Sequence, residues 1–242
     1  MAFGLHLANV SLGESIVIQG AGGLGLYATA LAKERGASPI IVIDGIKSRL
    51  RLAEEFGADE IVDMGQYPSA PERVARVLQI VGPDDLDGAV EVVGLPQVFI
   101  EGLQMVRPGG HYCVMGQVSR GDAGTVPFTP AMLLGKNIVS AGGYDPWVLP
   151  VAMDFMARIL DRYPFHKLVS HQYPLTDITQ AFQDPGWARD GAGALAGIMW
   201  GTPPGSLPPL ARRRRAPRRG SRRAGAPVPG SSHSTGASHP LQ

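Results

Sequence analysis

Short runs of hydrophobic, mostly β-branched residues alternate with longer helical segments between Ser15 and Ala141. Between the early runs, apolar residues recur three and four positions apart, the spacing of one helix face. Gly36 and Gly57 each follow such a segment and predict helix ends. The residue just after a helix often has a left-handed backbone conformation, which glycine adopts most easily. The runs that we predict as strands are 15–19, 40–44, 60–63, 89–93, 111–115 and 137–141.

Strands that alternate with helices predict a parallel sheet with right-handed crossovers. The runs are almost wholly apolar, which indicates a sheet covered by helices on both faces. The predicted fold class is therefore α/β, a doubly wound parallel Rossmann sheet, over residues 1–162. After Ala141 the alternation weakens, and we predict helices at 146–160 and 175–183 and a last strand at 194–200.

The turn after the first predicted strand is rich in glycine. The stretch IVIQGAGGLGLYATALAKERG contains Gly20-x-Gly22-x-x-Gly25 between a strand and a helix. In a dinucleotide site the first glycine permits a tight turn, the second lets a pyrophosphate approach the backbone, and the third lets helix and strand pack closely. The helix N-terminus then presents N–H groups to the phosphates. A glycine turn that serves packing alone is the alternative.

An acid follows at the distance that such a site requires. Asp44 ends the second predicted strand, 19 residues after Gly25, close to the spacing of the acid that binds the adenosine ribose. A carboxylate there accepts hydrogen bonds from ribose hydroxyls and repels a 2′-phosphate, which favours NAD over NADP. A methyltransferase that uses S-adenosylmethionine has a similar turn and acid, and remains a second alternative.

Several ordered blocks resemble one family over about residues 5–200. They are the stretch from Gly13 to Asp63, then GAVEVVG, LQMVRPGGHYCVMGQ, PAMLLGKNI and LVSHQYPLTDITQAF. They are similar to the coenzyme domain of zinc-type medium-chain dehydrogenases, which include alcohol, sorbitol and threonine dehydrogenases. The resemblance implies pyrophosphate contacts in the glycine turn, adenosine contacts at Asp44 and Arg49, and backbone near the nicotinamide after the fourth and fifth strands. The predicted cofactor-binding residues are Gly20, Gly22, Gly23, Leu24, Gly25, Asp44, Arg49, Val93, Gly94, Met115 and Gly116.

The same resemblance implies a further domain, which we expect to be missing from this chain. In the family a GroES-like catalytic domain precedes the coenzyme domain and supplies the zinc ligands. The first residues of this chain match the helix just before the first coenzyme-domain strand, so we expect the zinc ligands to be absent and the gene product to be truncated. Cys113 lies within a predicted strand, and His166 and His171 lack helical spacing. The function expected is NAD(H) binding in an alcohol or polyol dehydrogenase, and a non-catalytic binding module is the alternative.

The C-terminal third differs in composition. Residues 163–200 pack on the catalytic domain in the family, so we expect Phe165, Leu168, Val169, Ile198 and Trp200 to lack a covering partner. Residues 201–242 are rich in Arg, Pro, Gly and Ser and predict disorder. Eight of the 22 Lys and Arg residues lie there with no acid, so 14 basic residues face 21 acidic ones before it, a net charge of −7. Because no aromatic residue is interleaved with the arginines, nucleic-acid binding is not expected.

The remaining features concern location and assembly. The single cysteine is typical of a reducing compartment, and no apolar run approaches the ~18 residues needed to cross a membrane. We therefore expect a cytoplasmic protein that does not bind membranes. The resemblance also places a homodimer contact at residues 123–130.

Overall fold

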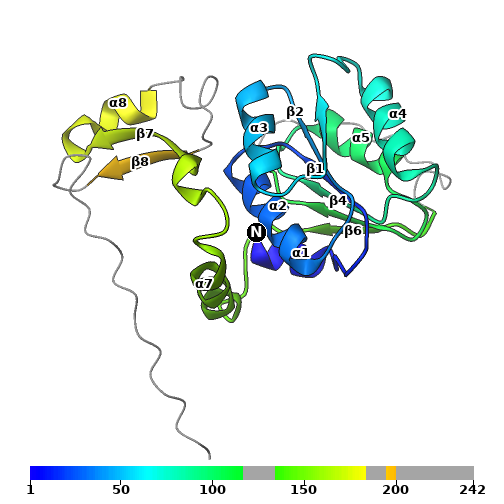
Figure 1. Cartoon of the computed structure of the whole chain (residues 1–242), viewed down its shortest axis with the longest axis horizontal. Helices are drawn as coiled ribbons and strands as arrows, with labels where there is room; N and C mark the ends of the chain where they lie inside the picture. The colour runs from blue at the N-terminus through cyan, green and yellow to red at the C-terminus, as the bar shows by residue number, and fades with distance from the viewer. Residues whose placement is uncertain (117–133, 184–194, 200–242) are drawn as a thin grey trace, which may run out of the picture. The chain divides into compact units, whose positions relative to one another are not determined.

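The computed structural model describes residues 1–116, 134–183 and 195–199 of the chain. Its first and larger part is a parallel sheet with helices (Figure 1). The elements of this part are α1 (Ala2–Leu7), β1 (Ile16–Gln19), α2 (Gly23–Arg35), β2 (Ile40–Asp44), α3 (Lys47–Glu55), β3 (Glu60–Asp63), α4 (Ala70–Val81), β4 (Gly88–Glu91), α5 (Pro96–Met105), β5 (His111–Val114), β6 (Asn137–Ser140) and α7 (Val148–Ile159).

The six strands pair in the order β3-β2-β1-β4-β5-β6, and every pair is parallel. The chain moves outward from β1 to β3 and then returns to place β4 on the other side of β1. Ligands of open α/β sheets bind where the strand order reverses in this way, at the carboxyl ends of the strands. The predicted Rossmann fold class is thus confirmed, and the reversal lies between β1 and β4.

All six predicted strands are present, with small differences at their ends. β4 ends at Glu91, so Val92 and Val93, which the prediction placed in the strand, lie in the following loop. Gly36 ends α2 in the left-handed conformation with φ of 81°, as predicted, and Gly57 follows α3 with φ of 99°. The predicted helix at 175–183 is a short 3-10 turn, η2 (Leu175–Asp177), followed by α8 (Ile178–Gln183).

Alternate side chains of β1 enter two separate cores. Ile16 and Ile18 pack with α1, α2 and α3, whereas Val17 packs with residues of α4 and α5. Successive side chains of a strand point to opposite faces, so a strand covered on both sides is buried along its whole length. This explains why all four residues of β1 are buried.

The C-terminal part adds η1 (Phe165–Leu168), β7 (Val169–Pro174) and β8 (Leu195–Met199), and β7 and β8 form a two-stranded parallel sheet. The expectation that Phe165 and Leu168 lack a covering partner is wrong. Phe165 stacks on Tyr27 at 5.4 Å between ring centroids and meets Phe56 edge-on at 5.2 Å, and Leu168 is 1% exposed. The α/β domain itself covers them.

Some predictions concern residues outside the described ranges. These are the dimer contact at 123–130, the disordered tail at 201–242 and the position of Trp200. The division of the chain after residue 162 stays a prediction. Within the described ranges, the structure contains no helix of the length and hydrophobicity that a membrane span requires.

Candidate functional site

The glycine turn joins the end of β1 to the start of α2 at the reversal of strand order. Gly20 has φ of 104°, a conformation that side chains other than glycine rarely adopt. Its N–H donates to the carbonyl of Ile43 on β2 at 2.8 Å. A Cβ built on Gly20 would lie 2.8 Å from Cγ2 of Val93. Glycine is therefore required here both by the backbone and by the loop that follows β4.

The other two glycines of the motif have different surroundings. A Cβ on Gly25 would collide with the carbonyl oxygen of Gly20, so close packing of α2 on the turn needs glycine there. Gly22 is the N-cap of α2 with φ of −70°, and a Cβ built on it meets nothing within 4 Å. The space beside Gly22 is thus open. The first-turn N–H groups of any helix have no acceptor within the helix and can bind an anion from that side.

Asp44 connects the carboxyl end of β2 to the glycine turn. Its Oδ2 accepts from the N–H of Ala21 at 2.7 Å, and its Oδ1 accepts from the N–H of Ile46 at 2.8 Å. These two bonds hold the carboxylate at the rim of the turn. The acid predicted from its spacing to Gly25 therefore lies beside the first two glycines in three dimensions.

A cavity of about 350 Å³ opens between these elements. Of the predicted cofactor-binding residues, the five that line it are Gly20, Gly22, Asp44, Arg49 and Val93. The six that are absent from its lining are Gly23, Leu24, Gly25, Gly94, Met115 and Gly116. Residues that the sequence analysis did not select complete the lining, namely Ile43, Gly45, Met64 and Val92. Met64 follows β3 and is 41% exposed. Its position just after a predicted strand is the feature of the sequence that could have indicated it.

The loops after β4 and β5 touch each other beside this cavity. A Cβ on Gly116 would lie 2.5 Å from Cα of Gly94, so the two backbones approach closely. The side chain of Met115 lies elsewhere, since its sulfur occupies the place that a Cβ on Gly4 of α1 would take. Only the backbone at Met115 can therefore face a ligand at the carboxyl edge of the sheet.

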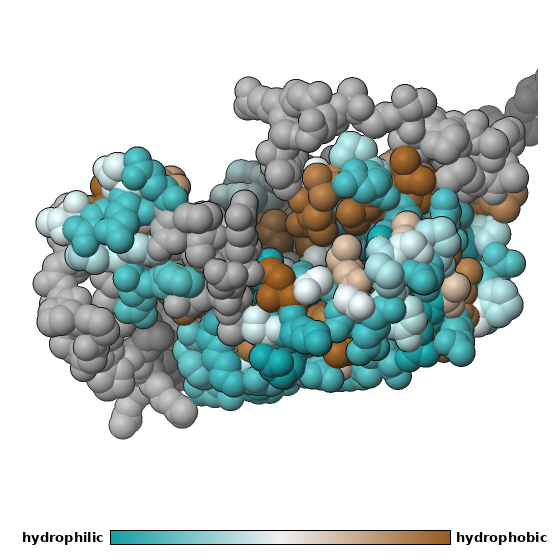
Figure 2. Space-filling model, turned by 90° about the horizontal axis from the view of Figure 1, so that it is seen from above, coloured by the Kyte–Doolittle hydropathy of each residue, from teal (hydrophilic) through white to brown (hydrophobic). Residues whose placement is uncertain are grey.

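Hydrophobic side chains also reach the surface of the α/β domain, and Figure 2 shows them gathered among hydrophilic ones on one face. Leu24, in the first turn of α2, is 47% exposed. Met64 lines the cavity and is also partly exposed, so apolar surface lies beside the open turn.

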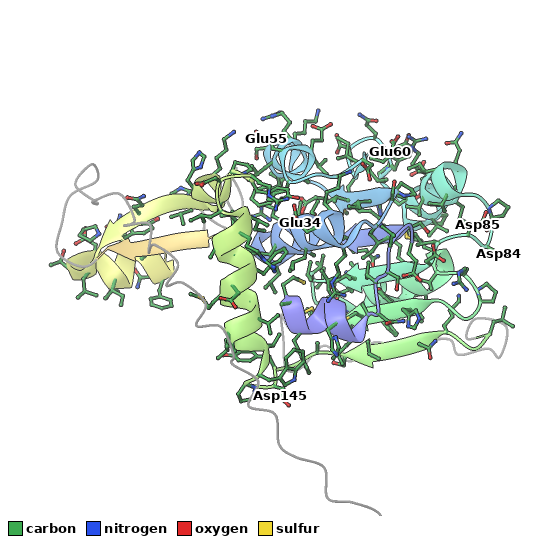
Figure 3. All side chains as sticks on the ribbon, turned by 60° about the horizontal axis from the view of Figure 1, so that its bottom comes forward. Glu34, Glu55, Glu60, Asp84, Asp85 and Asp145 are labelled. Carbon is green, nitrogen blue, oxygen red and sulfur yellow. The ribbon has the colours of Figure 1, made fainter. Side chains whose placement is uncertain are left out.

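A larger cavity, about 620 Å³, lies between α1, α2 and α7. Glu34 of α2, labelled in Figure 3, is among its lining residues, and its carboxylate pairs with the Arg162 guanidinium at 2.8 and 3.0 Å. Tyr163 also donates to Glu34 at 2.9 Å, and burial together with this bond raises the pKa of Tyr163 to about 12. Because Glu34, the acid in this lining, is already paired with Arg162, we place the candidate site at the glycine turn instead.

Comparison with known proteins shows the family to which the chain belongs. The family model described as zinc-binding dehydrogenase matches residues 23–158, more than half of the chain. The chain belongs to the zinc-binding dehydrogenase family. The family resemblance inferred from the sequence is thereby confirmed.

Individual relatives cover most of the chain. A 5-exo-hydroxycamphor dehydrogenase from Pseudomonas putida is 33% identical over 177 residues, which is 72% of this chain and 48% of the relative. An alcohol dehydrogenase from Cupriavidus necator is 30% identical over 199 residues, 80% of this chain and 51% of the relative. A crystal structure of an alcohol dehydrogenase from Thermotoga maritima superposes with a TM-score of 0.69 at 29% identity and covers 79% of this chain and 53% of that one. The chain spans about half the length of the curated relatives it matches.

The family name implies zinc, but the described residues do not fit it. Among them, no three His, Cys, Asp or Glu side chains are grouped so that they could hold a metal ion. Cys113 is buried within β5, and burial raises the pKa of its thiol to about 11. No catalytic step is therefore assigned to zinc in the part of the chain that the structure describes.

Proposed function

We propose that this chain is the NAD(H)-binding part of a zinc-type dehydrogenase that acts on an alcohol or polyol. The observation that carries the proposal is the open space beside Gly22, with the N-terminus of α2 on one side and the Asp44 carboxylate on the other. In dinucleotide-binding folds of this kind the pyrophosphate lies at the N-terminus of this helix, and the acid after the second strand binds the ribose diol. When bound, NAD supplies the acceptor for a hydride.

The residues of the chain have separate tasks in this proposal. The N–H groups at the start of α2 hold the pyrophosphate. Asp44 accepts hydrogen bonds from the adenosine ribose, and its negative charge disfavours the extra phosphate of NADP. Arg49 and Met64 line the cavity on the adenosine side. The oxidation of an alcohol by the whole protein is part of the proposal and rests on the names of relatives such as the Cupriavidus necator alcohol dehydrogenase.

Calorimetric titration with NADH tests the proposed function. Saturable binding of NADH, with weaker binding of NADPH and none of S-adenosylmethionine, is the expected result. Preferred binding of S-adenosylmethionine would support the methyltransferase alternative that the glycine turn and acid left open. If the folded chain bound none of the three ligands, the proposal would be wrong.

Replacing Asp44 with alanine tests the ribose assignment. Hydrogen bonds to a charged group contribute about 1.5–3 kcal/mol each, so we expect Asp44→Ala to weaken NADH binding roughly 10-fold or more. The preference for NADH over NADPH should fall in the same variant, because the repelling charge is gone. Glu55→Ala, at the exposed end of α3 (Figure 3), is the control and should change neither constant. An unchanged preference in Asp44→Ala would contradict the assignment.

A further inference from the structure

Glu91 is a buried acid at the carboxyl end of β4. Its side chain is 1% exposed. The carboxylate oxygen Oε1 accepts from the N–H of Val93 at 2.6 Å and also from the N–H of Gly94. One carboxylate thus satisfies two backbone donors in the first loop beyond the strand, and the cavity-lining residue Val93 is one of them.

The backbone of the same residue holds the neighbouring loop. The carbonyl oxygen of Glu91 accepts from the N–H of Met115 at 2.8 Å and from the N–H of Gly116 at 3.1 Å. Side chain and main chain of Glu91 together therefore bind four N–H groups, two in each of the loops that follow β4 and β5. These are the two loops that approach within van der Waals contact at Gly94 and Gly116.

The loop after β4 reaches the glycine turn directly. Val93 lines the cavity, and its Cγ2 is the atom nearest to the position of a Cβ on Gly20. Gly94 has φ of 85°, so the chain turns sharply just after Val93. The two bonds to Oε1 span this turn. A shift of the turn would therefore move the Val93 side chain relative to Gly20 and alter the cavity wall.

A purely packing role does not explain an acid at this place. A buried carboxylate is costly unless hydrogen bonds compensate it, and an apolar side chain of similar size would fill the same space without that cost. Without an acceptor, however, the N–H groups of Val93 and Gly94 would lose their partner beside the cavity, at about 1–3 kcal/mol for each unsatisfied group.

We propose that Glu91 is a positioning residue of the dinucleotide site, which holds the Val93–Gly94 turn against the glycine turn. This inference rests on the proposed function, because it concerns the same cavity. Glu91 itself does not line the cavity, so it acts through the backbone that it binds. Glu91 therefore affects the affinity for the cofactor by holding the Val93–Gly94 turn in the conformation that fits it.

The test compares two replacements of Glu91 in the full chain. Glu91→Met keeps the volume but removes the acceptor, and we expect its Kd for NADH to rise at least 10-fold. Glu91→Gln keeps a carbonyl oxygen at the same reach and is expected to bind NADH within about threefold of the wild type. If Glu91→Met does not fold, Glu91→Asp replaces it in the test. The Asp side chain is shorter by one methylene group, so its carboxylate lies further from the two N–H groups. We expect its Kd for NADH to be at least threefold higher than that of the wild type.

Glu101 provides a matched control. It is also a buried glutamate, 5% exposed, but it pairs with Arg73 at 2.7 and 2.9 Å between α4 and α5 and does not line the cavity. Glu101→Gln is expected to lower the melting temperature and leave the NADH Kd within twofold of the wild type. If Glu91 contributed to stability alone, its variants would also melt at a lower temperature and bind NADH within twofold of the wild type.

Hydrogen exchange gives a second readout that needs no cofactor. The amides of Val93 and Gly94 should exchange faster in Glu91→Met than in the wild type, while the amides of β1 stay unchanged. Unchanged exchange at Val93 and Gly94, or NADH binding by folded Glu91→Met at the wild-type Kd, would overturn the inference. If the wild type itself does not bind NADH, the proposed function fails first. If the wild type binds NADH and folded Glu91→Met binds it equally well, the positioning role fails alone.

Discussion

Gly22 and Gly25 lie three positions apart at the start of α2, yet their surroundings differ. A Cβ at Gly25 would overlap the carbonyl oxygen of Gly20, so the fold excludes it. At Gly22 the backbone angle suits any residue and the space is open. If a pyrophosphate fills that space, glycine at 22 serves the ligand and glycine at 25 serves the packing.

Alanine at each position separates these two roles. We expect Gly22→Ala to lower the free energy of unfolding by less than about 1 kcal/mol, the cost of a poorer N-cap, and to weaken NADH binding about 10-fold or more. Gly25→Ala should lower the free energy of unfolding by about 2 kcal/mol or more, because overpacking must displace backbone. Denaturant unfolding and calorimetry measure the two effects. Normal NADH binding by Gly22→Ala would mean that the open space is not the phosphate site.

At the scale of elements, the register of β1 and β4 brings the site together. Ser15 and Asp87 precede these strands, and Asp87 accepts from the N–H of Ser15 at 2.9 Å and from its hydroxyl at 3.0 Å. Arg107 also donates to Asp87 at 2.9 Å. With the strand starts tied, the paired residues at the other end are Gln19 and Glu91. The glycine turn after β1 and the loop after β4 therefore begin at neighbouring positions on the carboxyl edge of the sheet.

The hydrogen bonds of Asp87 make stability depend on pH. Partial burial raises the pKa of Asp87, but the bonds from Ser15 and Arg107 outweigh it, and the net pKa is lowered. A lowered folded-state pKa contributes stability above the unfolded value of about 3.9 that is lost as pH falls through the folded value. We expect Asp87→Asn to be less stable than the wild type by about 1 kcal/mol at pH 7, and the difference to shrink below about pH 4.

Thermal or denaturant unfolding at pH 3 to 7 measures this difference. The control is Asp85→Asn, two residues earlier on an exposed loop (Figure 3), which should stay close to the wild type throughout. A difference between Asp87→Asn and the wild type that is as large at pH 3 as at pH 7 would show that the charge of Asp87 is not what stabilises the strand starts.

The sequence predicted some strands more accurately than others. β1 and β2 are short apolar runs that end in glycine or acid, so sequence reasoning located them within one residue. β7 was missed, because residues 169–174 mix Val, Tyr and Pro with polar residues and show no alternation. Its pairing with β8, about 25 residues later, is a long-range contact that local periodicity does not encode.

At the scale of the whole molecule, β6 ends the six-stranded sheet in the part of the chain that the structure describes. Three of its four residues are exposed, and Ile138 is 39% exposed. The edge of a sheet offers unpaired backbone groups to another chain. This edge lies next in sequence to the dimer contact predicted at 123–130.

We therefore expect two copies of the chain to associate through this edge, and light scattering to give the mass of a dimer. Ile138→Arg should shift the mass toward that of one chain, since a charge is costly to bury in such a contact. Met153→Arg, on α7 at a position 70% exposed, is the control and should leave the dimer intact. A wild-type chain that is a monomer at every concentration would contradict the expectation.

The sequence by itself determined the strand–turn–helix order, the parallel sheet, the glycine turn and the acid at Asp44. These follow from local periodicity and from backbone conformations that few residues adopt. Only the tertiary structure decided that Val93 forms the wall opposite Gly20, that Glu91 holds two loops, and that Phe165 is covered by Tyr27 and Phe56. Those contacts join residues far apart in the chain, and which of them meet depends on the strand order and register of the folded sheet.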